Sequence, residues 1–158
     1  MKILVIYDSA FGNTEIVAKA IAGVGSQVGS IKLLLVGEVT ATDLRSVDVL
    51  IVGSPTQGGM PTKATQEYLH ALASKSLVGI KIAAFDTRFA ISEHGIGLKV
   101  LMRTIGFAAP RIATILKQKG GEQVVKPEGF LVDNKEGPLK DGEIERAESW
   151  TQGILQSV

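Results

Sequence analysis

A loop of small and polar residues follows the first apolar run of the sequence and could bind an anion. Its members are Ser9, Ala10, Phe11, Gly12, Asn13 and Thr14. A helical spacing of apolar residues begins after Thr14, so the loop is predicted to end at a helix N-terminus, where free N–H groups and the helix dipole favour negative charge. Gly12 allows close approach of the backbone to a ligand. We therefore predict a site for a phosphate monoester, and the alternative is a helix N-cap made by Asn13 or Thr14 with no ligand.

Two nucleotide-binding motifs are excluded for this loop. It contains no lysine, which the phosphate loop GxxxxGK[ST] requires. It also lacks the GxGxxG pattern of dinucleotide-binding proteins. Neutral donors, rather than a lysine, would therefore hold the phosphate.

Two further segments place polar residues and glycines where predicted strands end. The second segment contains Ser54, Pro55, Thr56, Gln57, Gly58, Gly59, Met60 and Pro61. The third is predicted as a loop over residues 86–92, and it contains Asp86, Thr87, Arg88 and Phe89. Both segments also have a plainer interpretation, because Ser54-Pro55 could form only a turn and Asp86 could cap its own loop.

The elements that must position these loops can be predicted from apolar patterning. Continuous apolar runs, typical of strands buried on both faces, predict strands at residues 3–7, 31–36, 47–52, 80–85 and 112–116. A short edge strand is predicted at 129–132, since Pro127 just before it would suit a central strand poorly. Helices are predicted at 14–22, from Pro61 through Leu72, at 98–105 and from about 141 to 155. In the last helix, Ile144, Ala147, Trp150 and Ile154 are predicted to face inward.

The alternation of strands with helices predicts one doubly wound α/β domain over residues 1–158, with helices on both faces of a parallel sheet. Ligands in such folds bind beyond the carboxyl ends of the strands, at the point where the strand order reverses. All three polar segments follow carboxyl ends of predicted strands. We therefore expect them to meet in one site.

Composition narrows the classes of function. The net charge is +1, which argues against general attraction to nucleic acid or acidic membranes. The chain has no cysteine and two histidines, so we expect no disulfide, no thiol nucleophile and no transition-metal site. The apolar run at residues 3–7 is too short for a signal peptide core or a membrane span, and a cytoplasmic location is the default expectation.

Residues 7–18, Tyr-Asp-Ser-Ala-Phe-Gly-Asn-Thr-Glu-Ile-Val-Ala, resemble the FMN-phosphate signature of the flavodoxin family. Gly53-Ser54-Pro55-Thr56, with Gly58 and Pro61, is similar to the second flavin loop of that family, and residues 86–92 take the position of the third. The resemblance covers nearly the whole chain. It implies a five-stranded parallel sheet of order 2-1-3-4-5 and one noncovalently bound FMN.

The resemblance also implies roles for individual residues. It assigns Ser9, Phe11, Asn13 and Thr14 to the phosphate, Ser54, Pro55 and Thr56 to the ribityl chain and a ring edge, Gln57, Gly58 and Gly59 to the flavin N5, and Asp86, Thr87 and Arg88 to the pyrimidine end. Ala10, Gly12 and Phe89 complete the predicted cofactor-binding set.

The chain departs from the family pattern in charge and in aromatic residues. Flavodoxins are typically strongly acidic, whereas this chain has a sequence pI near 8.0. They commonly stack the flavin between a tryptophan and a tyrosine, but the second segment here has no aromatic residue and the third offers Phe89 alone. Arg88 turns toward the pyrimidine edge, where it would stabilise the reduced flavin, or else it points to solvent or pairs with Asp86.

The resemblance implies a low-potential electron carrier that acts between redox partner proteins, as a monomer or weak dimer. The alternative is an FMN-dependent reductase of quinones or other small acceptors, which the missing aromatic residues would suit. A third possibility is a regulatory module that has lost the flavin, although the intact loop at residues 9–14 argues against it.

Overall fold

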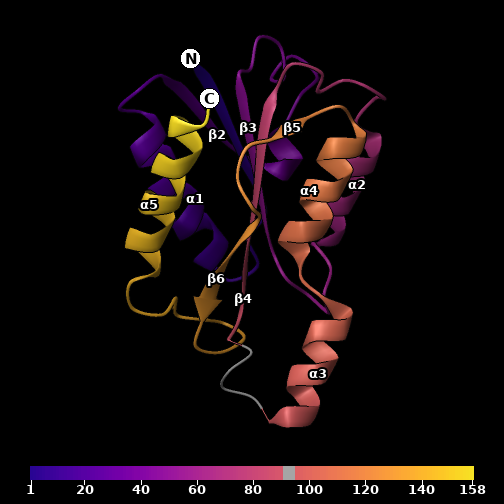
Figure 1. Cartoon of the computed structure of the whole chain (residues 1–158), viewed down its shortest axis with the longest axis vertical. Coiled ribbons are helices and arrows are strands. Elements are labelled where there is room, and N and C mark those ends of the chain that lie inside the picture. Colours follow the sequence, from indigo (N-terminus) through magenta and orange to yellow (C-terminus); the bar gives the residue numbers. More distant parts are fainter. Residues whose placement is uncertain (91–94) are drawn as a thin grey trace.

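A twisted parallel β-sheet forms the centre of the computed structural model, which describes residues 1–90 and 95–158 (Figure 1). Its strands are β1 (Lys2–Tyr7), β2 (Ser30–Leu35), β3 (Val49–Pro55), β4 (Lys81–Phe89), β5 (Glu122–Gln123) and β6 (Glu128–Val132). The order is β2-β1-β3-β4-β5, and β6 pairs in parallel with β4 as a small addition. The predicted fold class and strand order are therefore confirmed.

Two layers of helices cover the sheet (Figure 1). The helices are α1 (Asn13–Gly25), α2 (Lys63–Ala71), α3 (Ile96–Ile105), α4 (Ala108–Gln118) and α5 (Glu143–Gln156), and a single 3₁₀ turn, η1 (Val36–Glu38), follows β2. Helices α1 and α5 lie on one face and α2 and α4 on the other, while α3 extends beyond the carboxyl ends of the strands, below α4. Both termini lie at the opposite end of the molecule.

The alternation of side chains along each strand builds two separate cores, because successive residues of a strand point to opposite faces. Leu4 and Ile6 of β1 pack with buried residues of α2 and α4, such as Leu69. Ile3 and Val5 pack instead with buried residues of α1 and α5. Burial on both faces explains why these strands are continuous apolar runs in the sequence.

The strand predicted at residues 112–116 is wrong, because this segment belongs to α4. The residues of α4 that are buried recur at a helical spacing, and they are Ala108, Ala109, Ile112, Ala113 and Leu116. The five-residue window contained too little of this pattern to reveal its period. Two short strands occupy the position beside β4 that a fifth strand would take. β5 pairs with the first half of β4, and β6 pairs with its second half.

The third polar segment begins as a strand rather than a loop. Residues 86–89 continue β4, since their backbone pairs with Gly129 to Val132 of β6. Ser54 and Pro55 likewise belong to β3. Ile91 and Ser92, at the end of the predicted third loop, lie outside the described residues.

An aromatic cluster joins α5 to the sheet. The rings of Phe85, Phe130 and Trp150 meet edge to face, with centroids 6.1–6.2 Å apart. Ala147 and Ile154 are buried as predicted, but the prediction for Ile144 is wrong, since 43% of its surface is exposed. The buried residues of α5 are Glu143, Ala147, Thr151 and Ile154, and this spacing of three to four residues leaves position 144 at the edge of the buried face.

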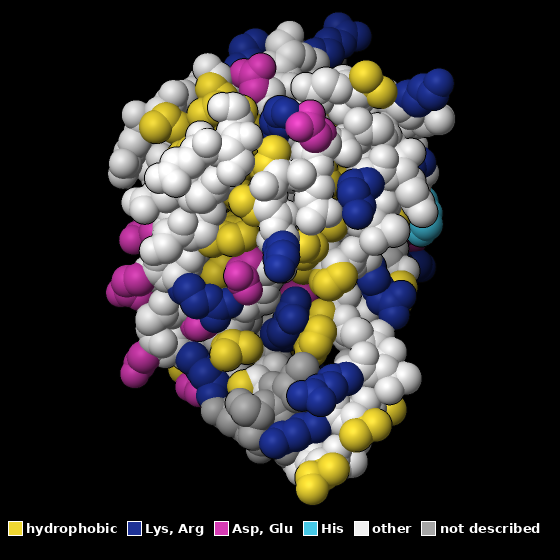
Figure 2. Space-filling model, in the orientation of Figure 1, with side chains coloured by type: hydrophobic (Ala, Val, Ile, Leu, Met, Phe, Trp, Pro, Cys, Tyr) yellow, Lys and Arg dark blue, Asp and Glu magenta, His cyan; other side chains and the backbone are white. Residues whose placement is uncertain are grey.

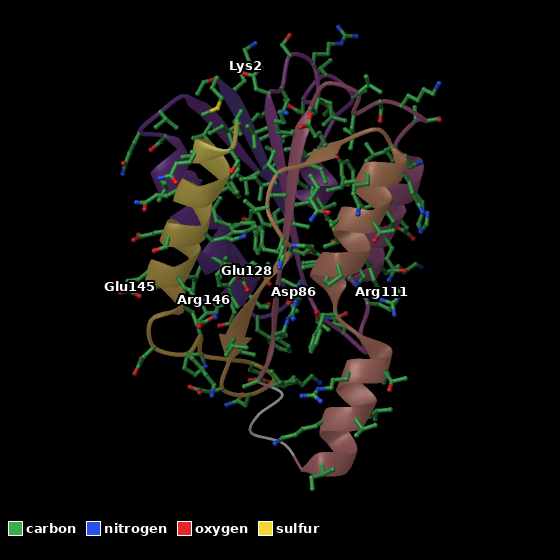
Figure 3. The ribbon with its side chains drawn as sticks, viewed as in Figure 1. Lys2, Asp86, Arg111, Glu128, Glu145 and Arg146 are labelled. Carbon is green, nitrogen blue, oxygen red and sulfur yellow. The ribbon has the colours of Figure 1, made fainter. Side chains whose placement is uncertain are left out.

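Arg146 forms a polar clamp between α5 and β6 (Figure 3). It donates to Glu143 of its own helix at 2.7 Å and to Glu128 of β6 at 3.0 Å.

Within the described part of the chain, no helix is both long enough and apolar enough to cross a membrane.

Candidate functional site

A cavity of about 450 Å³ opens at the carboxyl ends of β1, β3 and β4. Its lining comes from segments far apart in the sequence: Ala10, Phe11, Asn13, Thr14, Pro55, Thr56, Gln57, Gly58, Thr87, Arg88, Phe89, Val132 and Lys135. In Figure 2, lysine and arginine side chains gather on the lower part of the visible face, toward the carboxyl end of the sheet. The three predicted segments are therefore brought together at one cavity, with basic groups nearby.

The first loop is shaped by Ser9 and Gly12, which do not line the cavity. Ser9 Oγ accepts hydrogen bonds from the backbone N–H groups of Gly12 at 3.0 Å and Glu15 at 3.4 Å. Gly12 is the N-cap of α1 and has a φ of 88°, a left-handed conformation that favours glycine. Neither Asn13 nor Thr14 caps the helix, so the alternative of an N-cap made by these residues is wrong.

Thr14 and Asn13 lie in the first turn of α1 and face the cavity. The Thr14 hydroxyl is 2.9 Å from the Thr87 hydroxyl, which ties α1 to the end of β4. Asn13 Nδ2 donates to the Glu136 carbonyl at 2.9 Å. The start of α1 is thus fixed from two sides, with the Asn13 amide held by the loop that follows β6.

A tight turn forms the second loop. Gln57 and Met60 exchange backbone hydrogen bonds of 2.9 and 3.0 Å around Gly58 and Gly59. The φ angles of the two glycines are 57° and 80°, and positive φ at both central positions is the pattern of a type I′ turn. Gln57 and Gly58 line the cavity, whereas the Gly59 carbonyl faces away and accepts from Arg111 Nε at 2.8 Å.

Ser54 and Thr56 have different positions in the same segment. Ser54 is fully buried behind the cavity, and its hydroxyl accepts from the Thr62 backbone N–H at 2.9 Å. Thr62 caps α2 and donates to Asp8 Oδ2 at 2.5 Å, which ties the start of α2 to the residue just before the first loop. Thr56 lines the cavity, and its hydroxyl accepts from the Ala108 N–H at the start of α4.

Asp86 is fully buried and does not line the cavity. Its carboxylate accepts from Arg88 Nε and Nη2 at 2.5 and 2.7 Å and from the Ala109 N–H at 2.7 Å. Burial raises the pKa of Asp86 above its ordinary value, while the hydrogen bonds and charge of Arg88 act in the opposite direction. Of the orientations predicted for Arg88, the structure therefore shows the pair with Asp86.

The guanidinium of Arg88 also stacks on the Phe107 ring, 3.8 Å from its centroid. This contact and the Asp86 pair hold the side chain flat against the cavity wall, which it helps to line. Asp86 therefore compensates most of the positive charge of Arg88 at the cavity wall.

Sequence reasoning missed two lining residues, Val132 and Lys135. Both follow from the pairing of β6 with β4, which brings a segment more than forty residues away beside Thr87 to Phe89. Lys135 could have been predicted as a site residue, because it is a positively charged residue just after the strand predicted at 129–132. Among the predicted residues, Ser9, Gly12, Ser54, Gly59 and Asp86 support the cavity from behind and the others line it.

Comparisons with known proteins agree with this arrangement. No curated protein sequence matches the chain significantly. The structure is similar to oxidised flavodoxin 1 from Bacillus cereus, with a TM-score of 0.77 and 20% identity over 100% of this chain and 99% of that one. It is also similar to a flavodoxin from the domain Archaea, with a TM-score of 0.74 and 19% identity over 99% and 97% of the two chains.

A third similar structure is a flavodoxin, WrbA-like protein from Agrobacterium tumefaciens, with a TM-score of 0.72 and 18% identity over 99% of each chain. At these identities the structural matches establish the fold. The sequence itself establishes the family, because the model of the flavodoxin domain matches residues 4–101, well over half of the chain. With the strand order and the cavity at the carboxyl ends, this match shows that the chain belongs to the flavodoxin domain family.

Proposed function

We propose that this protein binds FMN in the cavity at the carboxyl ends of β1, β3 and β4 and carries electrons between redox partner proteins. The observation that supports this most directly is the convergence of all three predicted flavin segments on one cavity. Its volume of about 450 Å³ lies in the usual range of roughly 300–1,000 Å³ for cofactor sites. When bound, FMN would supply the redox chemistry, and the protein would supply position and electrostatics.

The residues present suit the phosphate end of FMN. The N-cap of α1 is Gly12, and no side chain caps the helix by a hydrogen bond. The backbone N–H groups of Asn13 and Thr14 are therefore available to an anion. The Thr14 hydroxyl can donate to a phosphate oxygen while accepting from Thr87. Lys135, an exposed residue that lines the cavity, adds positive charge.

The residues around the rest of the cavity suit a flat aromatic ring. Phe11 of the first loop and Phe89 at the end of β4 supply aromatic surface, and Pro55 and Val132 add apolar surface. Both aromatic residues are phenylalanines, so the ring would be held without the tryptophan and tyrosine that many flavodoxins use. The neutral Gly58 peptide beside them would face the ring.

The surface next to the cavity supports a carrier that docks on partner proteins. Helix α3 exposes Ile96 and Val100, with 82% and 59% of their surfaces accessible, and carries the basic residues Lys99 and Arg103. Arg111 of α4 joins the end of this helix to the second loop, because it donates both to the Gly59 carbonyl and to the Ile105 carbonyl. We therefore infer a partner with an acidic docking face.

The phosphate assignment is tested by replacing Thr14 with valine, which keeps the shape and removes the hydroxyl. A lost hydrogen bond to a charged acceptor is worth about 1.5–3 kcal/mol, so FMN affinity should fall at least about tenfold. Riboflavin, which lacks the phosphate, should bind equally well to both proteins. The readout is a flavin fluorescence titration.

Thr151→Val is the matched control, because Thr151 is equally buried but lies on α5, where its hydroxyl donates to the Ala147 carbonyl. It should leave both affinities unchanged. Equal losses of FMN and riboflavin affinity in Thr14→Val would show that the phosphate lies elsewhere.

Steady-state assays separate the carrier from the alternative reductase. A carrier should show slow turnover of NAD(P)H with a quinone unless a partner protein is added. Rapid turnover by the purified chain with FMN alone would favour the reductase, and no saturable FMN binding at all would contradict both.

A further inference from the structure

The cavity at the carboxyl ends of β1, β3 and β4 is lined by two cationic side chains, and no carboxylate lines it within the described residues. Arg88 is one of the two, and Asp86 already compensates most of its charge. Lys135 is the other. It is exposed, and among the described residues its ammonium group forms no ion pair or hydrogen bond. The uncompensated positive charge of this lining therefore comes from the loop that follows β6.

The loop that carries Lys135 is closed by hydrogen bonds within its own backbone. The N–H of Asp133 donates to the Pro138 carbonyl at 3.0 Å, and the N–H of Gly137 donates to the Asn134 carbonyl at 3.1 Å. These bonds give the loop a defined shape before any ligand arrives. Little backbone entropy is then lost when its lysine binds an anion, because a preorganised loop has already been ordered by folding.

The same loop lies directly against the first turn of α1. Asn13 Nδ2 donates to the Glu136 carbonyl at 2.9 Å. The next residue, Gly137, has a φ of 105°, and a Cβ there would lie 2.5 Å from Asn13 Oδ1, so the close approach of the two segments requires a glycine. Lys135 precedes Glu136, and consecutive Cα atoms are about 3.8 Å apart. The Lys135 backbone is thus held beside Asn13 and Thr14, which line the same cavity.

We propose that Lys135 is a specificity-determining residue of the flavin site, whose ammonium group pairs with the phosphate of FMN and selects the phosphorylated flavin over riboflavin by charge. This inference rests on the proposed binding of FMN. The first loop has no lysine, so the sequence by itself predicts only neutral donors for the phosphate. The fold supplies the missing cation from a segment near the other end of the chain, and residues 133–138 become a fourth cofactor-binding segment.

Flavin fluorescence titrations of FMN and riboflavin test this role in two variants. At about 0.01 M salt, where the Debye length is about 30 Å, charge interactions are screened least. We expect Lys135→Gln to weaken FMN about three- to tenfold, as suits a partly exposed pair with a phosphate. Riboflavin affinity should not change, because riboflavin carries no phosphate. Lys135→Arg keeps the charge and should restore FMN affinity to nearly the native value.

The dependence on salt separates an ionic role from a structural one. At about 1 M salt the Debye length is only about 3 Å, so the difference in FMN affinity between the native chain and Lys135→Gln should shrink to less than about twofold. Lys117→Gln is the matched control, because it removes an equal charge from an exposed position in the last turn of α4. It should leave the affinities for both flavins unchanged at either salt concentration.

The possible results distinguish this inference from the proposed function. Equal FMN affinities of the native chain and Lys135→Gln at low salt overturn the role of Lys135 and leave FMN binding intact. Equal losses for FMN and riboflavin, or a loss that persists at high salt, would show that the side chain only shapes the cavity and would also overturn it. A native chain that binds no FMN saturably contradicts both the proposed function and this inference.

Discussion

Asp86 and Arg88 form an ion pair that is buried on the carboxylate side, where Asp86 has no exposed surface and Arg88 keeps 18% of its side chain exposed. Breaking a buried pair is costly because the remaining charge has no partner. Two hydrogen bonds join the pair, and a third holds the N-terminus of α4 through Ala109. The pair therefore fixes the end of β4 and the start of α4 relative to each other.

We predict that Asp86→Ala and Arg88→Ala each lower the free energy of unfolding by about 3–5 kcal/mol. The double variant should lose clearly less than the sum, since it leaves no unpaired charge in the interior. Urea unfolding of the three variants without flavin measures this coupling. Fully additive losses would mean that the pair does not act as a unit.

The elements of the first half of the chain could be predicted because each carries its own pattern. Strands buried on both faces appear as continuous apolar runs, and β1 and β3 were found in this way. The same criterion failed at residues 112–116, where a buried helix face supplies an equally apolar short run. β5, with two residues, is too short to leave any pattern, and only its tertiary pairing with β4 defines it.

Helix α4 can be distinguished from a strand by one pair of substitutions. A strand would bury Ile112 and Thr114 on the same side, whereas the helix buries Ile112 and exposes Thr114. We expect Ile112→Ala to lower the free energy of unfolding by about 2–5 kcal/mol and Thr114→Ala to change it by no more than about 0.5 kcal/mol. Comparable losses in thermal or urea unfolding would argue for the strand.

The glycine turn of the second loop gives a second test at this scale. A Cβ at Gly58 would meet no atom within 4 Å, but a Cβ at Gly59 would lie 2.1 Å from Ile105 Cγ2 and 3.0 Å from the Ile105 carbonyl oxygen. Gly58→Ala should cost roughly 1–2 kcal/mol for its left-handed backbone alone. Gly59→Ala should cost more, and part of that excess should disappear in the background of Ile105→Ala.

Thermal unfolding of the four proteins measures these differences. If Gly59→Ala is no worse than Gly58→Ala, α3 does not pack against the turn as the structure shows. The resemblance places the peptide beside the flavin N5 at one of these two glycines, and the cavity-facing position of Gly58 favours Gly58 for that proposed role.

At the scale of the molecule, the cavity could be predicted only in part. The three segments at the ends of β1, β3 and β4 were expected to meet, because parallel strands end at a common edge. Lys135 and Val132 reach the same place through the pairing of β6 with β4, and long-range pairing is not visible in local periodicity. What the sequence lacked was the information that β6 lies beside the second half of β4.

This arrangement predicts which parts of the chain tolerate insertion. Both termini lie at the end of the molecule opposite the cavity (Figure 1), so a tag at either terminus should leave FMN affinity unchanged. A two-residue Gly-Ser insertion between Lys135 and Glu136 should weaken FMN binding, because it disturbs a lining residue and the bond from Asn13 to the Glu136 carbonyl. Flavin titration of the tagged and inserted proteins gives the comparison. Undiminished binding by the insertion variant would show that this loop does not help to hold the cofactor.

The aromatic cluster under α5 gives the molecule a built-in optical reporter. Trp150 is the sole tryptophan of the chain, and it packs against Phe85 and Phe130, next to the two strands whose far ends border the cavity. Tryptophan emission overlaps flavin absorption, so energy transfer to a bound flavin would dim a single, assignable fluorophore. Trp150 would then report two events without any added label. Its emission wavelength would report the docking of α5 on the sheet, and its fluorescence lifetime would report the arrival of a flavin.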